Sequence, residues 1–154
     1  MIIELLDEYV LNVLKESGWS KDRKQDIHPW IQILSEEGYK VNNYAQSILK
    51  ELGNLQIRIS GDKNHLGVTL HFNPINAASG EYDRMEIFNA VSNDELFPIG
   101  ECYDWVIYVS SSKKVYLGDW QSLSIAGDSI EEFLNNIFNP KFQLKEIYTN
   151  NNLN

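Results

Sequence analysis

The sequence has few of the residues on which metal sites and many enzymes depend. Its 154 residues include one cysteine, Cys102, and three histidines, His28, His65 and His71. A single cysteine cannot form an internal disulfide or a thiolate zinc site, and no two histidines have the four-residue spacing that places two ligands on one helical face. We therefore expect no metal and no cofactor. Cys102 lies in an alternating apolar stretch, which predicts a buried, inert thiol.

Other absences narrow the function classes further. No apolar run approaches the roughly 20 residues that cross a bilayer, and the N-terminal residues 1–4 lack the basic and apolar regions of a secretory signal. The chain has neither a Gly-rich phosphate loop nor a Gly-x-Ser-x-Gly nucleophile motif. These features predict a cytoplasmic protein with no membrane segment and no nucleotide site.

What the sequence does contain is enough apolar material for one core. The composition is 43% hydrophobic and 12% aromatic, well above the range in which chains stay disordered. A chain of this length forms one domain of ordinary size. We expect a single domain over residues 1–154, with 149–154 as a frayed tail.

Apolar side chains recur at helical spacing in the first third of the chain and again later. Three early helices are predicted over residues 2–15, over 28–38 with Asp26 as N-cap, and from Asn42 or Asn43 to Leu52. A helix over 81–92 should turn Tyr82, Met85, Phe88 and Ala90 or Val91 inward. A last helix, capped by Asp128 or Ser129, should bury Ile130, Phe133, Leu134 and Ile137.

Between these helices the period changes to two, which predicts strands. Residues 55–59 and 66–72 should form a hairpin around a turn at 60–65, and further strands are expected at 96–101, 104–109, 114–118 and 121–125. Residues 141–148 are either a strand or a packed segment. This order favours an α+β domain with N-terminal helices, a central antiparallel sheet and a C-terminal helix, and we expect the helices to pack against one side of the sheet.

The negative charge is concentrated in one part of the chain. Residues 81–132 carry 11 acidic and three basic side chains, which is −8 of the total net charge of −9. An acidic surface repels phosphate backbones and attracts cationic proteins. The sequence therefore argues against direct nucleic-acid binding and favours a protein partner with a basic surface.

This window supplies the candidate partner-binding residues. Tyrosine and tryptophan are enriched in interface hot spots, so three aromatic residues of the window are candidate anchors. The candidates are the carboxylates Glu81, Asp83, Glu86, Asp94, Glu95, Glu101, Asp104 and Asp119, and the aromatic residues Tyr103, Trp105 and Trp120. An alternative is that the carboxylates provide solubility, turns and caps and that the aromatic residues belong to the core.

A catalytic interpretation of the same window is also open. Glu101 and Asp104 are the pair best placed for general acid–base chemistry in a small hydrolase, which needs one carboxyl desolvated and the other ionised. However, Glu101 follows a predicted strand and Asp104 begins the next one, so turn or cap duty explains both residues without catalysis. Replacing both with amides distinguishes the hydrolase from a binding protein.

Several segments, in this order and spacing, resemble the third subgroup of the SUKH superfamily of bacterial immunity proteins. They are "SGWSKDR" (17–23), "EEGY" (36–39), "ILKELGNLQI" (48–57), "LFPIGE" (96–101), "YV" with "KVYLGD" (108–119) and "AGDSIEEFLNNIF" (126–138). The resemblance covers residues 17–138. It departs from the family at "VSSSKKVY", where a glycine usually precedes the basic residue of the turn, so Ser111 and Ser112 are expected to accommodate the turn.

The resemblance implies an α+β fold with helices before and after a curved sheet. It implies that the protein neutralises a polymorphic toxin, commonly a nuclease or other nucleic-acid-modifying domain, by binding it without catalysis or cofactor. The family offers no catalytic residues to carry over. A monomer is favoured, and a protein-interaction adaptor of the same fold is the alternative function.

Overall fold

The computed structural model describes residues 1–59 and 69–150. Its helices are η1 (Ile3–Leu5), α1 (Glu8–Glu16), α2 (His28–Glu37), α3 (Asn43–Leu52), α4 (Pro74–Ala78), η2 (Tyr82–Arg84), α5 (Met85–Ser92) and α6 (Ile130–Ile137). Its strands are β1 (Gln56–Arg58), β2 (Thr69–His71), β3 (Phe97–Cys102), β4 (Trp105–Val109), β5 (Val115–Gly118), β6 (Ser122–Gly127) and β7 (Lys145–Thr149). The predicted α+β class is confirmed.

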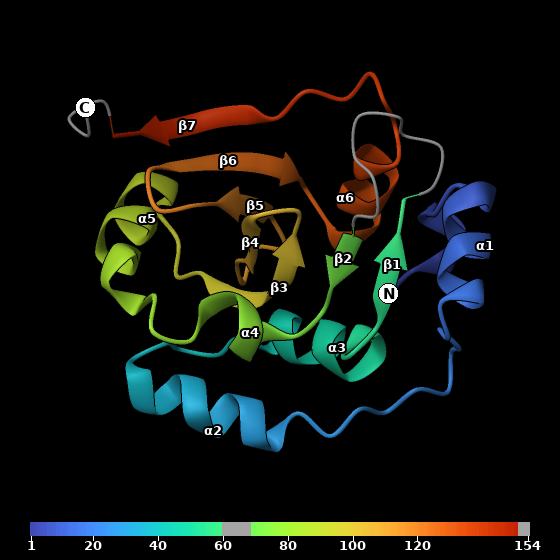
Figure 1. Ribbon diagram of the computed structural model, residues 1–154, viewed down its shortest axis with the longest axis horizontal. Coiled ribbons are helices and arrows are strands. Elements are labelled where there is room, and N and C mark those ends of the chain that lie inside the picture. The colour runs from blue at the N-terminus through green and yellow to red at the C-terminus, as the bar shows by residue number, and fades with distance from the viewer. Residues whose placement is uncertain (60–68, 151–154) are drawn as a thin grey trace.

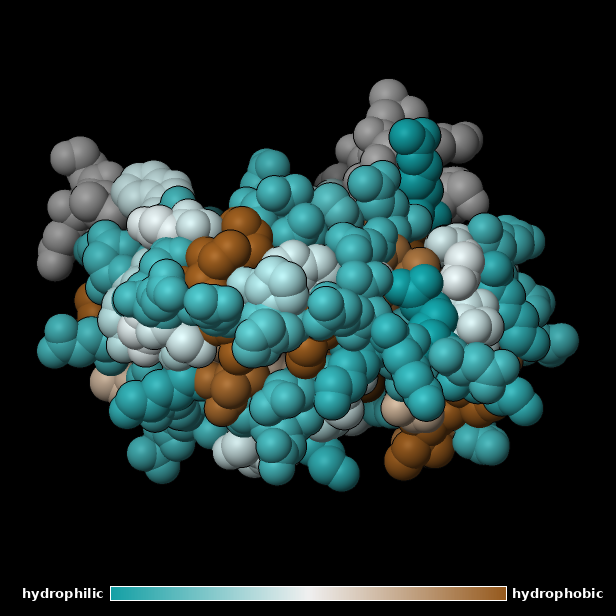
Figure 2. Space-filling view, turned by 90° about the horizontal axis from the view of Figure 1, so that it is seen from below, coloured by the Kyte–Doolittle hydropathy of each residue, from teal (hydrophilic) through white to brown (hydrophobic). Residues whose placement is uncertain are grey.

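The seven strands form one antiparallel sheet in which every strand pairs with its neighbour in the chain. Figure 1 shows β3, β4 and β5 in the middle of the molecule and β6 and β7 along one edge. In this view α5 lies on the left, α2 and α3 lie below, and α1 and α6 lie on the right. In this view helices thus flank the sheet on the left, below and on the right, and β7 lies along the remaining edge. The two outer strands of the sheet are β1 and β7. Seen from below, the molecule is mostly hydrophilic with some hydrophobic patches (Figure 2).

Three predicted helix ends are confirmed by their hydrogen bonds and backbone angles. The Asn42 side chain accepts a hydrogen bond from the Ala45 backbone N–H at 2.8 Å, and the Ser129 hydroxyl accepts one from the Glu132 N–H at 3.1 Å. Both bonds satisfy amides that would otherwise be unpaired in the first turn. Gly38 ends α2 with a φ of 115°, a left-handed conformation that glycine adopts without steric cost.

Two helix starts differ from the prediction. The N-terminal helix is split, because Leu6 and Asp7 are extended and separate η1 from α1. Asn135 of α6 stabilises this break by accepting from the Asp7 N–H and donating to the Leu5 carbonyl, both at 2.9 Å. Asp26 is not the N-cap of α2, which is Ile27; Asp26 instead accepts from the His28 N–H at 3.1 Å.

Helix α4 was not predicted. The Asn73 side chain caps it by accepting hydrogen bonds from the backbone N–H groups of Ile75 and Asn76, both at 3.1 Å. Pro74 occupies the first helical position, where its missing N–H costs nothing. Asn73 and Pro74 therefore begin a helix shortly after β2 ends.

The first hairpin is confirmed in its pairing. Ile57 of β1 lies opposite Leu70 of β2, and Gln56 lies opposite His71. The predicted turn at 60–65, together with His65, Leu66 and Val68, lies outside the described residues. The C-terminal stretch forms β7, so the strand alternative is the correct one for residues 145–149. The expected tail at 149–154 begins too early, because Thr149 pairs with Ser122 and the Asn150 N–H donates to the Gln121 carbonyl at 2.7 Å. Residues 151–154 lie outside the described part.

The central strands are buried on both faces, so the expectation that helices cover one side is wrong for them. All four residues of β5 and four successive residues of β4 are buried, although successive side chains point to opposite faces. On one face, Phe88 of α5 packs edge-on against Tyr108, with ring centroids 5.8 Å apart. Cys102 is fully buried, and burial raises the pKa of its thiol to about 12, so the prediction of a buried thiol is confirmed.

The β4–β5 turn lies where a glycine is usual in the family, and its conformation differs from the prediction. The left-handed position is taken by Lys113, with a φ of 77°, and not by Ser111 or Ser112. The Lys113 N–H donates to the Ser110 carbonyl at 3.1 Å, and the Lys114 N–H donates to the Ser110 hydroxyl at 3.2 Å. Hydrogen bonds to Ser110 therefore hold a turn that glycine would otherwise favour.

Candidate functional site

Five of the candidate residues gather at one end of the sheet. Strands β3 and β4 are joined there by a turn at Tyr103 and Asp104, and β5 and β6 are joined there by a turn at residues 119–121. Strands β4 and β5 are neighbours, with Val106 opposite Gly118. We call this group the hairpin-end surface and define it as Tyr103, Asp104, Trp105, Asp119 and Trp120.

Aromatic side chains dominate the hairpin-end surface. Trp120 has 62% of its surface exposed, the largest fraction among the exposed large hydrophobic residues described. Tyr103 adopts a left-handed backbone, with a φ of 55°, and its ring meets the half-buried Trp105 edge-on at a centroid separation of 6.1 Å. Exposed indole of this kind is unfavourable in water and is typical of an interface anchor.

The two carboxylates of this surface have different roles. Asp119 holds its own turn, because one of its oxygens accepts from the Gln121 N–H at 3.0 Å, the Ser122 N–H at 2.8 Å and the Ser122 hydroxyl at 3.0 Å. Asp119 therefore stabilises a turn, as the alternative interpretation of the carboxylates expected. The hydrogen bonds of Asp119 hold the loop that carries Trp120. Asp104 is exposed at the tip of its turn.

Glu101 lies one residue before the end of β3 and is paired across the sheet. One of its carboxylate oxygens is 3.8 Å from Nδ1 of His71, which lies opposite it on β2. Its side chain is 38% exposed, so the pair is at the surface. Glu101 thus adjoins the hairpin-end surface but points to a different neighbour.

Helix α5 lies beside this end of the sheet. A Cβ atom added at Gly118, the residue before Asp119, would stand 2.9 Å from Cε2 of Phe88. While Phe88 is buried, Ile87 and Val91 are 46% and 41% exposed, and Glu86 is exposed as well. We call Glu86, Ile87 and Val91 the α5 ridge.

The α5 ridge corrects part of the sequence analysis. Either Ala90 or Val91 was expected to face inward, together with Tyr82, but Ala90 and Val91 are both exposed, and Tyr82 is 37% exposed. Ile87 was not among the candidate residues. The spacing of Ile87 and Val91 places them on one side of the helix, a signal that is present in the sequence but that a core helix would give equally well.

The structure does not bring the remaining carboxylates to the hairpin-end surface. Asp94 and Glu95 precede β3 and so lie at the opposite end of that strand. There Asp94 accepts from the Ser112 hydroxyl at 2.9 Å, and a Glu95 oxygen is 3.9 Å from Nζ of Lys40. Glu81 forms an ion pair with Arg84, and Asp83 is exposed in η2. The acidic window is therefore divided into separate groups.

The described residues offer neither a metal-binding cluster nor a membrane-spanning helix. Over residues 1–59 and 69–150, no group of three or more His, Cys, Asp or Glu side chains is arranged to hold a metal ion. In the same ranges, no helix has the length and apolar character that spanning a membrane requires.

Comparison with protein families gives one clear result. The model of the SUKH-3 immunity protein family matches residues 6–140, a span that contains α1 to α6, β1 to β6, the hairpin-end surface and the α5 ridge. Comparisons with curated proteins and with solved structures give no match. The match begins before residue 17, where the resemblance in the sequence begins, so α1 is part of the family's fold. Because the family model covers most of the chain, this chain belongs to the SUKH-3 immunity protein family.

Proposed function

We propose that this immunity protein neutralises its cognate toxin by covering a basic surface of the toxin domain with the hairpin-end surface, the α5 ridge and Asp83 of η2, which directly precedes α5. The observation that carries the proposal is the 62% exposure of Trp120 on a turn that Asp119 holds with three hydrogen bonds. Because these bonds hold the backbone of the turn, less backbone freedom is lost when the indole binds a partner.

Charge supports the choice of partner. Asp83, Glu86 and Asp104 are exposed, and none of them has an ion-pair partner among residues 1–59 and 69–150. Toxins that act on nucleic acids need a cationic surface for the phosphate backbone. Carboxylates that approach such a surface steer association and compete with the substrate for the same contacts. The toxin is therefore expected to be a nuclease or another nucleic-acid-targeting domain.

Neutralisation by this route needs no chemistry in the immunity protein. Occlusion requires contact area and slow dissociation, and a central aromatic anchor surrounded by polar residues supplies both. Trp120, with Ile87 and Val91 as further apolar contacts, fills the role of the anchor.

Charge reversal tests the proposal. The triple variant Asp83→Lys, Glu86→Lys, Asp104→Lys should bind the cognate toxin domain at least tenfold more slowly at low salt, and its association rate should depend less on salt. The rate is measured by stopped-flow fluorescence over a range of ionic strengths. Growth rescue on co-expression with the toxin is the cellular readout.

The matched control changes the same amount of charge elsewhere. Glu8, Glu16 and Glu36 are exposed on α1 and α2, so Glu8→Lys, Glu16→Lys, Glu36→Lys alters net charge equally without touching the proposed surface. The proposal is wrong if both triple variants slow association by the same factor or if neither does. A chain that neither rescues growth nor binds the toxin would instead favour the adaptor function.

A further inference from the structure

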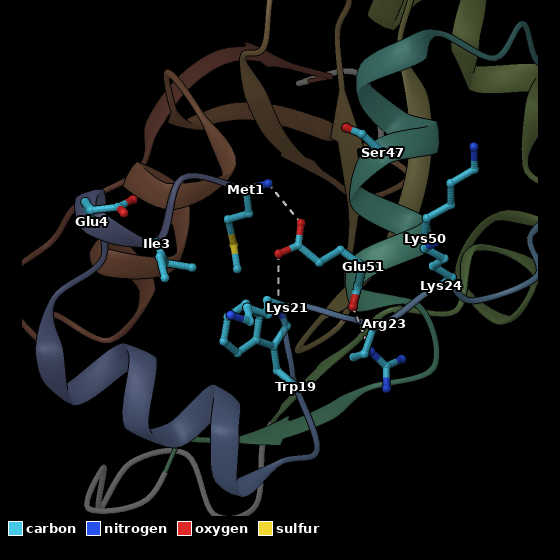
Figure 3. A pocket seen from close by; sticks show the side chains of 10 residues that line it. All are labelled: Met1, Ile3, Glu4, Trp19, Lys21, Arg23, Lys24, Ser47, Lys50 and Glu51. Carbon is cyan, nitrogen blue, oxygen red and sulfur yellow. Dashed lines mark hydrogen bonds and ion pairs between the residues drawn. The ribbon is translucent and has the colours of Figure 1, made fainter.

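The molecule also has a surface groove whose lining carries a net positive charge, in contrast to the acidic hairpin-end surface. It has a volume of about 540 Å³ and lies where the start of the chain, the segment that follows α1 and the C-terminal half of α3 meet (Figure 3). In Figure 1 the start of the chain lies on the right and α3 lies below the centre, whereas α5 and the β5–β6 connection are on the left. The groove therefore lies away from the hairpin-end surface.

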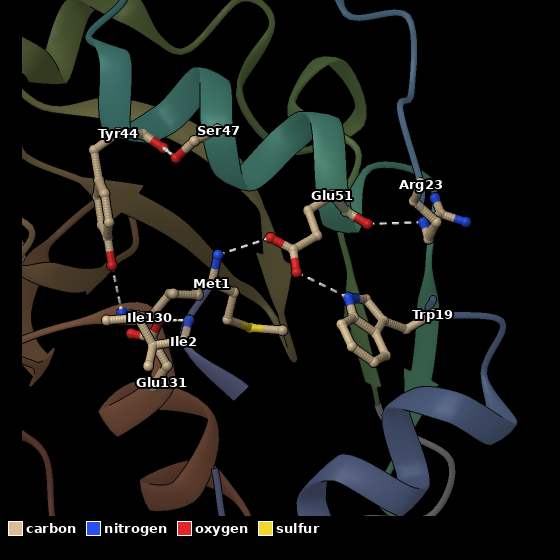
Figure 4. Close-up of polar contacts among 9 residues, drawn as sticks. All are labelled: Met1, Ile2, Trp19, Arg23, Tyr44, Ser47, Glu51, Ile130 and Glu131. Carbon is tan, nitrogen blue, oxygen red and sulfur yellow. Dashed lines mark hydrogen bonds and ion pairs between the residues drawn. The ribbon is translucent and has the colours of Figure 1, made fainter. Parts of the chain in front are cut away.

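Polar contacts inside the groove are already satisfied (Figure 4). The Glu51 carboxylate accepts from the amino nitrogen of Met1 at 2.8 Å and from the Trp19 indole N–H at 3.1 Å. Arg23 donates through Nε to the Glu51 carbonyl at 2.7 Å and through its terminal nitrogen to the Gly53 carbonyl. These bonds place the guanidinium at the C-terminal end of α3, where the helix dipole favours a cation. The walls are thus held in place without a ligand.

The cations at the rim are not used by the fold. Lys21, Lys24 and Lys50 line the groove and are exposed, and within residues 1–59 and 69–150 none of them forms an ion pair. The lining contains four basic side chains against two carboxylates, Glu4 and Glu51. A net positive groove on a chain of net charge −9 is a local reversal of sign, and it attracts anionic groups.

The other walls determine which anion fits. Met1, Ile3 and Trp19 give the groove an apolar side next to the basic rim, as Figure 3 shows. Glu4 and Glu51 lie in the lining and oppose a compact dianion such as phosphate, and the overall negative charge opposes a nucleic-acid backbone. The overall charge opposes an acidic peptide as well, but a peptide carries apolar side chains that a phosphate backbone lacks. Its carboxylates reach the outer lysines while an apolar side chain lies on Met1 and Ile3.

We propose that this groove binds an acidic peptide segment of a partner protein, with carboxylates on Lys21, Lys24 and Lys50 and an apolar side chain against the Met1, Ile3 and Trp19 wall. The site does not depend on the toxin-binding proposal, since the two surfaces share no residue. An immunity protein with such a groove has a second contact that remains available while the toxin is held.

The test uses the full chain and a fluorescein-labelled peptide of alternating Asp and Glu with one central Phe. Fluorescence anisotropy at low salt should show saturable binding, and the indole N–H resonance of Trp19 should shift in a ¹⁵N-correlated NMR spectrum. The variant Lys21→Glu, Lys24→Glu, Lys50→Glu should lose affinity at least tenfold. A peptide without the Phe should bind more weakly than the parent peptide.

A control with the same charge change isolates the site. Lys113→Glu, Lys114→Glu, Lys145→Glu alters three exposed lysines outside the groove and should change peptide affinity less than threefold. Circular dichroism confirms that both variants are folded. The proposal is overturned by absence of binding, by equal losses in the two variants, or by displacement of the peptide by inorganic phosphate or oligo-dT at lower concentrations than by unlabelled peptide. Toxin affinity of the groove variant should equal that of the parent chain.

Discussion

Phe88 of α5 and Gly118 of β5 are in such close contact that an added methyl group at Gly118 would stand 2.9 Å from the Phe88 ring. The same methyl would be 3.1 Å from Leu123 and 3.2 Å from Tyr108. Because Gly118 has no side chain, α5 can lie against the sheet beside the hairpin-end surface.

Gly118→Ala should destabilise the protein by about 1–3 kcal/mol, because Phe88 and Tyr108 are buried and cannot move aside freely. Urea unfolding measures the loss. The double variant Gly118→Ala, Phe88→Leu should lose less stability than the sum of the two single variants, because the smaller side chain relieves the contact. Additive losses would show that the two residues do not interact in this way.

Trp120→Ala should weaken toxin binding by about 30-fold or more, the loss that corresponds to removal of a hot spot. The indole is exposed, so the melting temperature should stay close to that of the parent chain. Isothermal titration with the toxin domain gives the affinity. A change of less than threefold would remove Trp120 as the anchor, and Ile33→Ala, which alters another exposed apolar residue on α2, is the matched control.

Asn42→Ala should cost about 1–2 kcal/mol of stability. The side chain caps α3 through the Ala45 N–H and also donates to the Val109 carbonyl at 3.3 Å, so the substitution removes a cap and a link from α3 to β4. The neighbouring exposed residue offers a control, since Asn43→Ala removes a side chain of the same size without a cap. Thermal unfolding that is equal for both variants would contradict the assignment.

The free energy of unfolding should fall as pH rises above about 9. Burial raises the pKa of the Cys102 thiol from 9.0 to about 12 and that of Tyr44 from 10.0 to about 12, and burial also raises the pKa of Tyr39 and Tyr108. Between the ordinary pKa of each group and its raised pKa, the unfolded chain loses protons that the folded chain retains, so a rise in pH favours unfolding. The stabilisation that these groups provide is fully present below pH 9 and is lost as the pH rises further.

Urea titrations at pH 8, 9, 10 and 11 measure this dependence. Cys102 should also stay unreactive toward a thiol reagent at pH 8 until the protein is unfolded, because its side chain is fully buried. Rapid labelling of the native protein, or stability that is constant up to pH 11, would contradict the buried environment.

Local chemistry explains which parts of the fold were predictable from the sequence. Asn42, Gly38 and Ser129 each act within a few residues of their own position, so their roles at helix ends could be recognised directly. The break between η1 and α1 could not, because it is stabilised by Asn135, which lies 128 positions from Asp7 in the chain. Helix α4 could have been recognised from Asn73 and Pro74, a cap followed by a favoured first residue.

The candidate surfaces were less predictable, because closeness in sequence is not closeness in space. Asp94 and Asp104 are both in the acidic window, yet the six residues of β3 carry them to opposite ends of the sheet. Trp120 was a candidate anchor because it is a tryptophan in the acidic window, and its exposure was seen only in the structure. The lysines of the groove belong to two segments, residues 21–24 and residue 50, that only the tertiary structure brings together.

The strand order has a consequence for how the molecule is made. Each strand pairs with the one synthesised just before it, so the sheet can be extended during translation without waiting for a distant partner. The start of the chain is different: the Ile2 N–H donates to the Glu131 carboxylate at 2.7 Å, and Asn135 holds Leu5 and Asp7. These bonds cannot form until α6 has left the ribosome, so Ile2, Leu5 and Asp7 are held in place only after β1 to β6 have been synthesised.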